Sequence, residues 1–167
     1  MLEMVLFNSQ VRSPGRDGER GEQKMDIYEA FKRENAKLAR VLAKLIDSSA
    51  GRSTEREQYL EQIELLLDCQ WRLEENYLYP VLDAFTDSRR AVEKARNENR
   101  VIGRILKELR SIDSSDPGFR YAAERLQSEA VTHMDWEQKE LLDMLRQKIP
   151  QEQAQLLGQR AAEEILA

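Results

Sequence analysis

The sequence is poor in the residues that tight turns, disulfides and imidazole-rich metal sites require. Its 167 residues include seven glycines, four prolines, one cysteine and one histidine. Scarce glycine and proline argue against a turn-rich β-sandwich. The lone cysteine, Cys69, cannot form an intrachain disulfide, which favours a reducing, cytoplasmic location. The lone histidine, His133, excludes any site that needs several imidazoles from this chain.

Long apolar runs and an excess of basic residues are also missing. No run approaches the roughly 18 apolar residues that a membrane-spanning helix needs. Lysine and arginine total 26 against 31 aspartates and glutamates, so the net charge is −5 at pH 7. A mildly acidic chain without a basic block is a poor candidate for binding nucleic acid. We therefore expect no membrane or nucleic-acid partner, and an unidentified protein partner stays open.

Apolar residues at helical spacing dominate the chain after an N-terminal segment that lacks them. Residues 12–24 hold three glycines, one proline and no apolar residue, which predicts a flexible tail over residues 1–24 and a helical domain over 25–167. Amphipathic stretches follow at about residues 26–47, 53–85, 92–109 and 119–149, with a shorter one at 151–165. Long helices joined by short loops predict an all-α, up-down-up-down four-helix bundle with a short extra C-terminal helix.

Each of the four long predicted helices carries a polar residue in the middle of its inward face. Two helices carry an i,i+4 pair, which places both side chains on one side of the helix. Burying such groups without partners costs several kcal/mol, so their matching heights predict one central polar site. In chain order the residues are Asn35, Gln70, Glu74, Asn99, His133 and Glu137.

These positions resemble the motifs of the hemerythrin-like family, also called HHE cation-binding domains. The family has a histidine on the first and third helices and His-x-x-x-Glu on the second and fourth. Four segments carry the resemblance, between about residues 26 and 148: DIYEAFKRENAKLARVL, QWRLEENYLYPVL, NENRVIGRILKEL and HMDWEQKELLDML. The resemblance implies a bundle that binds two irons, with Glu74 and Glu137 as bridging carboxylates and His133 as a retained ligand. Amides replace the other three histidines, at Asn35, Gln70 and Asn99.

The amides weaken the expected di-iron chemistry, because a side-chain amide ligates only through its oxygen. In the interpretation that the sequence favours, they hydrogen-bond to the glutamates and His133, no metal binds, and the bundle with its degenerate site is a non-enzymatic binding or regulatory protein. In a second, Glu74, His133 and Glu137 hold one weakly bound cation such as iron, for oxygen, NO or iron sensing or storage. In a third, only the fold is shared. None of the three predicts an enzyme.

Pro80 lies inside the second predicted helix, where it should kink or break the helix locally. Helical spacing continues the apolar face of this helix through Tyr77, Val81 and Phe85. On the same spacing Tyr79 falls on a different face from Glu74. Tyr77 is therefore the tyrosine expected to offer its phenol to the central site.

Overall fold

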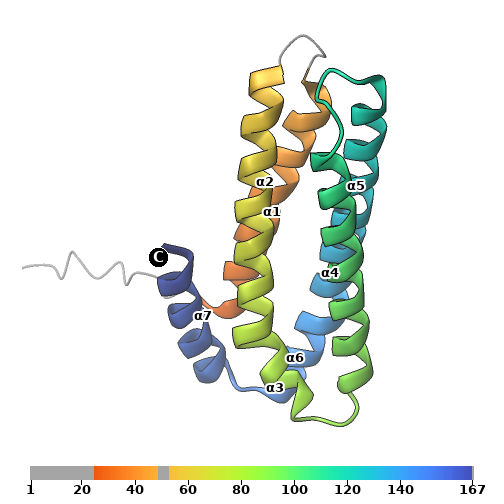
Figure 1. The fold of residues 1–167 in the computed structure, drawn as a ribbon. Coiled ribbons are helices and arrows are strands. Elements are labelled where there is room, and N and C mark those ends of the chain that lie inside the picture. Colours follow the sequence, from red (N-terminus) through yellow and green to blue (C-terminus); the bar gives the residue numbers. More distant parts are fainter. Residues whose placement is uncertain (1–24, 49–52, 167) are drawn as a thin grey trace, which may run out of the picture.

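Four antiparallel helices, two of which continue through a π-helical turn, form the long body of the molecule (Figure 1). The computed structural model describes residues 25–48 and 53–166, so the predicted tail at residues 1–24 lies outside the described residues. The four bundle helices are α1 (Ile27–Asp47), α2 (Ser53–Leu73), α4 (Arg89–Arg110) and α5 (Pro117–Trp136).

Two of these helices extend beyond their regular α-helical part. Helix α2 continues through the π-helical segment η1 (Glu74–Leu78) into α3 (Tyr79–Asp83), and α5 continues through η2 (Glu137–Leu141) into α6 (Leu142–Lys148). The last helix, α7 (Gln151–Leu166), packs mainly against α1 outside the bundle (Figure 1). This arrangement confirms the predicted all-α, up-down-up-down bundle with an extra C-terminal helix. Among the described helices, none is both long and apolar enough to cross a membrane.

Sequence signals account for where two of the bundle helices begin. Asp26 caps α1, because its carboxylate accepts a hydrogen bond from the backbone N–H of Glu29 at 3.0 Å. Asp116 caps α5 in the same way through the N–H of Gly118, at 2.6 Å. Pro117 follows at the first helical position, where its fixed φ suits the helix and its missing N–H is not needed.

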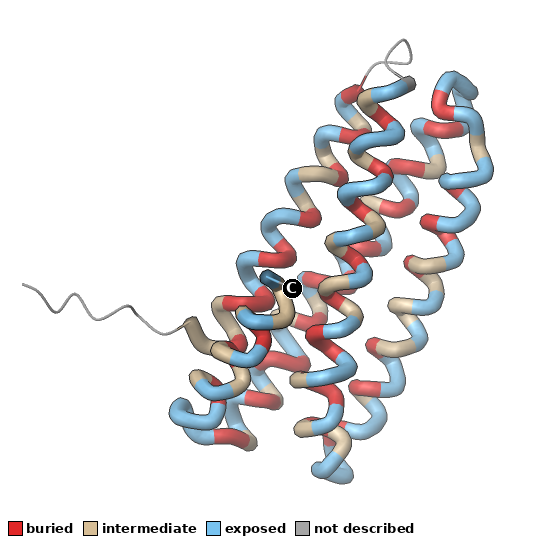
Figure 2. The backbone as a smooth tube through the Cα atoms, turned by 60° about the vertical axis from the view of Figure 1, so that its left-hand side comes forward, coloured by how far each residue is buried: buried red, intermediate tan, exposed pale blue. Residues whose placement is uncertain are grey.

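The predicted polar residues divide the core into two apolar clusters. Buried residues of the bundle are spread along its whole length (Figure 2). Along α1, for example, Phe31 belongs to one cluster and Leu38 to the other, with Asn35 between them. Along α4, Ala95 and Ile102 flank Asn99 in the same manner. The polar residues therefore form a layer across the middle of the bundle, with apolar packing on both sides.

The apolar face of the second helix departs from its predicted course after Glu74. The structure buries Leu78, Tyr79 and Leu82 there, whereas Tyr77 and Val81 are half-buried and Phe85 is 37% exposed. The prediction of Tyr77, Val81 and Phe85 was wrong because it extended α-helical spacing through a segment that is π-helical. A π turn holds more residues than an α turn, which rotates everything that follows. Pro80 lies at the start of α3, directly after this change of helix type, and the helix continues past it to Asp83.

Helix α7 is held against the start of α1 by a close backbone approach. Gly158 is buried, and a Cβ atom there would lie 2.6 Å from Cα of Asp26 and closer still to the carbonyl oxygen of Met25. No real Cβ tolerates such distances to backbone. Gly103, in α4, is different, because a Cβ there would meet the ring of Trp71 at an ordinary 3.5 Å.

We predict that Gly158→Ala lowers the free energy of unfolding by about 1–3 kcal/mol, because α7 must move away from α1 to admit the methyl group. Gly103→Ala is the matched control and should raise that free energy by up to about 1 kcal/mol, since alanine is the better helix former. Urea unfolding of both variants checks this. Equal effects of the two substitutions would contradict the packing of α7 described above.

Candidate metal centre

Three of the predicted site residues converge in the polar layer. One ligand atom each from Glu74 in η1, His133 in α5 and Glu137 in η2 lie within 4.8 Å of one another. The three residues are buried, at 1%, 5% and 0% exposure. Two carboxylates and one imidazole at these separations form a ligand set suited to a single divalent cation.

Both glutamates occupy the same structural position, the first residue of a five-residue π-helical segment. The backbone N–H of Tyr79 donates to the carbonyl of Glu74, and that of Leu142 donates to Glu137, each an i→i+5 hydrogen bond. Short π segments inside α-helices are rare and occur often at functional sites. Pro80 does not explain both segments, because neither η2 nor α6 contains a proline. A buried glutamate is the feature that they share.

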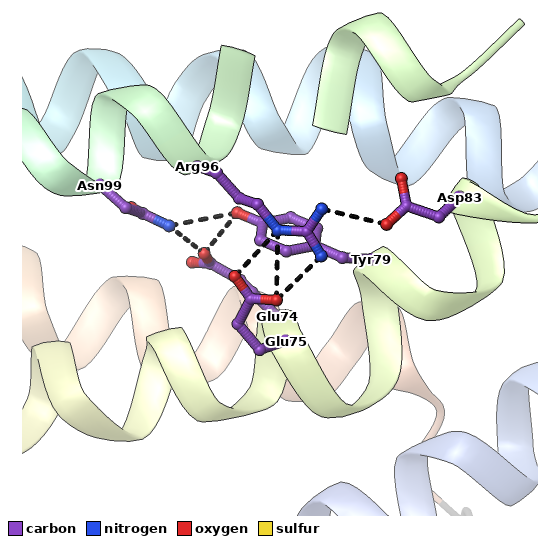
Figure 3. A network of polar contacts seen from close by, with 6 residues as sticks. All are labelled: Glu74, Glu75, Tyr79, Asp83, Arg96 and Asn99. Atoms are coloured by element: carbon purple, nitrogen blue, oxygen red, sulfur yellow. Dashed lines mark hydrogen bonds and ion pairs between the residues drawn. The ribbon is translucent and has the colours of Figure 1, made fainter. Parts of the chain in front are cut away.

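Tyr79, rather than Tyr77, brings a phenol to the site (Figure 3). Its hydroxyl donates to Oε2 of Glu74 at 2.6 Å. Nδ2 of Asn99 donates to the same carboxylate oxygen and, at 3.1 Å, to the phenol oxygen. The expectation for Tyr77 was wrong because the π turn places residue i+5 over residue i. The hydroxyl of Tyr77 instead donates to the backbone carbonyl of Arg160 in α7, at 3.5 Å.

Arg96, from α4, braces the outer side of this network (Figure 3). Its Nε and Nη2 donate to the Glu75 carboxylate at 3.0 and 2.9 Å, and its Nη1 donates to Asp83 at 3.0 Å. The guanidinium also lies over the ring of Tyr79, 4.9 Å from the ring centroid. One arginine thus ties α4 to η1 and α3, and it covers the tyrosine that donates to Glu74.

The amides that replace the expected histidines bond to only part of the site. Nε2 of Gln70 donates to Oδ1 of Asn35, and Asn99 donates to Glu74. Both carboxylate oxygens of Glu137 are buried without a hydrogen-bond partner among the described residues. The same holds for Nε2 of His133, for Nδ2 of Asn35 and for Oδ1 of Asn99. The expected amide network around both glutamates and His133 is therefore wrong for Glu137 and His133.

His133 contacts a carboxylate that the sequence analysis missed. Oε2 of Glu98, in α4, lies 2.9 Å from Nδ1 of His133, and Oε1 of Glu98 pairs with Lys94 at 2.7 Å. In the sequence, Lys94 and Glu98 look like an exposed i,i+4 ion pair, which hides the second role of the glutamate. No pattern in the sequence separates this glutamate from a solvent-exposed one.

Burial shifts the protonation of all three candidate ligands. It raises the pKa of Glu74 to about 7, although the hydrogen bonds from Tyr79 and Asn99 act in the opposite direction. Burial, followed by the nearby charge of Glu74, raises the pKa of Glu137 well above its usual value. Burial also lowers the pKa of His133, against the hydrogen bond to Glu98. A cation entering here would meet a neutral imidazole and would displace protons from the carboxyl groups.

Comparisons with known proteins agree with this architecture. The family model of the hemerythrin HHE cation binding domain matches residues 26–156. The crystal structure of a hemerythrin HHE cation binding domain-containing protein from Mycobacterium kansasii has a TM-score of 0.77 and 21% sequence identity, covering 84% of this chain and 85% of that one. At this identity the likeness establishes the fold. A comparison with curated protein sequences found no match. Because the family model covers well over half of its residues, the chain belongs to the hemerythrin HHE cation-binding domain family.

Proposed function

We propose that this protein is a non-enzymatic cation-binding protein that holds one divalent metal ion through Glu74, His133 and Glu137. The proposal rests above all on the buried carboxylate of Glu137. This residue is 0% exposed, and neither of its carboxylate oxygens has a hydrogen-bond partner among the described residues. Nε2 of His133 is likewise buried and unpartnered. Leaving such groups unsatisfied is costly, and one cation between them would satisfy both.

The composition of the ligand set favours a first-row ion that accepts both oxygen and nitrogen, such as Fe(II) or Mn(II). Imidazole suits iron and zinc, whereas carboxylate and amide oxygens suit manganese and magnesium. The buried, unpartnered Oδ1 of Asn99 offers a further oxygen beside Glu74. When bound, the ion would supply the positive charge that two adjacent buried carboxylates need.

The side of the layer formed by α1 and α2 supports one ion rather than two. There Gln70 and Asn35 hydrogen-bond to each other, and both are buried. A neutral amide pair contributes no anionic ligand, so a second cation would depend on the two glutamates already assigned to the first. One cation therefore matches the number of strong donors present.

Burial of the site favours binding over catalysis. The three candidate ligands are at most 5% exposed, which suits a small ion better than an organic substrate. Closed sites of this kind commonly stabilise a fold, and occupancy then shifts the folding equilibrium. Because cation occupancy would change the stability of the fold, we propose a regulatory or iron-sensing role.

A metal-free binding module is the second candidate function. It is favoured by Glu74, whose carboxylate accepts hydrogen bonds from the side chains of Tyr79 and Asn99. The two candidates differ in what they require of Glu137, because only the cation site uses its carboxylate as a ligand.

We predict that anaerobic loading with Fe(II), followed by desalting and elemental analysis, gives about one iron per chain. Glu137→Gln should lose the metal, because an amide replaces an anionic ligand. Glu140→Gln, an exposed residue of the same π segment, is the matched control and should retain it. No iron above the Glu137→Gln background would support the metal-free module, and two irons per chain would reject the single-ion site.

We further predict that Glu137→Gln stabilises the metal-free protein at about pH 8, by about 1–3 kcal/mol. The folded-state pKa of Glu137 is raised by burial and by the nearby Glu74, so the wild-type protein loses stability as the pH rises above the ordinary carboxyl pKa of about 4.3, and glutamine removes that loss. The gain should shrink toward about pH 5, where the folded protein already holds the proton.

Urea unfolding in the presence of a chelator, at several pH values, measures this difference. The lowered pKa of His133 changes stability with pH in the opposite direction, so the two proteins are compared with each other at every pH rather than each across pH. A pH-independent effect of Glu137→Gln would show that this carboxyl group does not titrate at a displaced pKa.

A further inference from the structure

We infer that Glu98 is a positioning residue for the cation site: its carboxylate holds the ring of His133 so that Nε2 is the ligand atom. Lys94, at the surface, pairs with the other oxygen of the same carboxylate. The inference rests on the proposed function for its effect on cation binding. Its structural part, the choice of ring nitrogen, applies equally to the metal-free protein and can be tested there.

The chemistry of the contact decides which nitrogen carries the proton. Oε2 of Glu98 lies 2.9 Å from Nδ1 of His133, and an ionised carboxylate can only accept a hydrogen bond. Nδ1 must therefore be the donor, which leaves the lone pair of the neutral ring on Nε2. Nε2 is also the nitrogen that is buried without a partner among the described residues. The free lone pair thus belongs to the ring atom that is available to a cation.

The second oxygen of Glu98 is held by a cation on the outside of the bundle. Nζ of Lys94 lies 2.7 Å from Oε1 of Glu98 and 3.2 Å from the ring centroid of Trp136. The Trp136 ring is itself 6.5 Å from the His133 ring, centroid to centroid. The side chains of Lys94 and Glu98 are 46% and 35% exposed, whereas that of His133 is 5% exposed. These residues form a row of contacts that runs from solvent to the buried ligand.

This row gives each residue a distinct effect on the site. Glu98 orients His133 and makes its ring a stronger donor to a metal, as carboxylates hydrogen-bonded to ligating histidines do. Lys94 partly neutralises the Glu98 carboxylate, and its own positive charge repels a cation bound nearby. Removal of Glu98 should therefore weaken cation binding, and removal of the charge on Lys94 should strengthen it.

The tautomer can be read directly, because His133 is the single histidine of the chain. Nitrogen NMR of the metal-free protein labelled with ¹⁵N-histidine, at about pH 8, should show a protonated Nδ1 and an unprotonated Nε2. In Glu98→Ala this preference should be lost. In Glu98→Gln it should survive, because the amide oxygen still accepts from Nδ1. A protonated Nε2 in the wild-type protein would overturn the inference, whether or not the protein binds a cation.

Cation affinity provides the second readout, with Mn(II) as the probe and its EPR signal as the measure of free ion. Glu98→Ala should weaken binding about 10–100-fold, and Glu98→Gln should fall between it and the wild type. Lys94→Met should bind Mn(II) more tightly than the wild type. Glu93→Ala removes an exposed carboxylate from the same helix and should leave the affinity unchanged.

The two measurements separate the failure of this inference from failure of the proposed function. If no variant and no wild-type protein binds Mn(II), the cation site is wrong, and the NMR result still decides the role of Glu98 in the metal-free protein. If Mn(II) binds and Glu98→Ala binds it as well as the wild type, Glu98 does not position the ligand. Circular dichroism of each variant confirms that the bundle is folded.

Discussion

Two carboxyl groups and an imidazole, buried side by side in an apolar bundle, are the constraint on which the rest of this structure depends. Glu74, Glu137 and His133 are almost fully removed from water, and the pKa values of both glutamates are raised in consequence. Burial of charge on this scale is unfavourable unless a counter-charge or hydrogen bonds compensate it. The bundle offers hydrogen bonds to Glu74 and leaves Glu137 without them, which is the asymmetry that one bound cation would resolve.

The helices around this polar layer place its side chains and hold them in position. Each glutamate begins a π turn, which changes the direction of the side chains that follow and brings Tyr79 over Glu74. Arg96 then covers that tyrosine and links α4 to the π segment. Apolar clusters above and below the layer hold the four helices together independently of it. The apolar packing on both sides of the layer does not depend on which polar residues lie between the two clusters.

The sequence was sufficient for the helices and for the height of the polar layer, because both follow from periodicity. Asn35, Asn99 and the two i,i+4 pairs could be placed on inward faces from spacing alone. The role of Tyr79 could not, because a π turn has no distinct sequence pattern, and a count in steps of 3.6 residues selects Tyr77. Glu98 was missed for a different reason. Its pairing with Lys94 is typical of a solvent-exposed helix face, and only the tertiary structure shows its other oxygen beside His133.

The proposed function requires one cation between the two buried glutamates and the histidine. Its most direct test is crystal diffraction from Mn(II)-loaded protein, with anomalous data collected at the manganese absorption edge. We expect a single anomalous peak bonded to Glu74, Glu137 and Nε2 of His133. A peak absent from the polar layer at saturating Mn(II), or two peaks bridged by the glutamates, would contradict it.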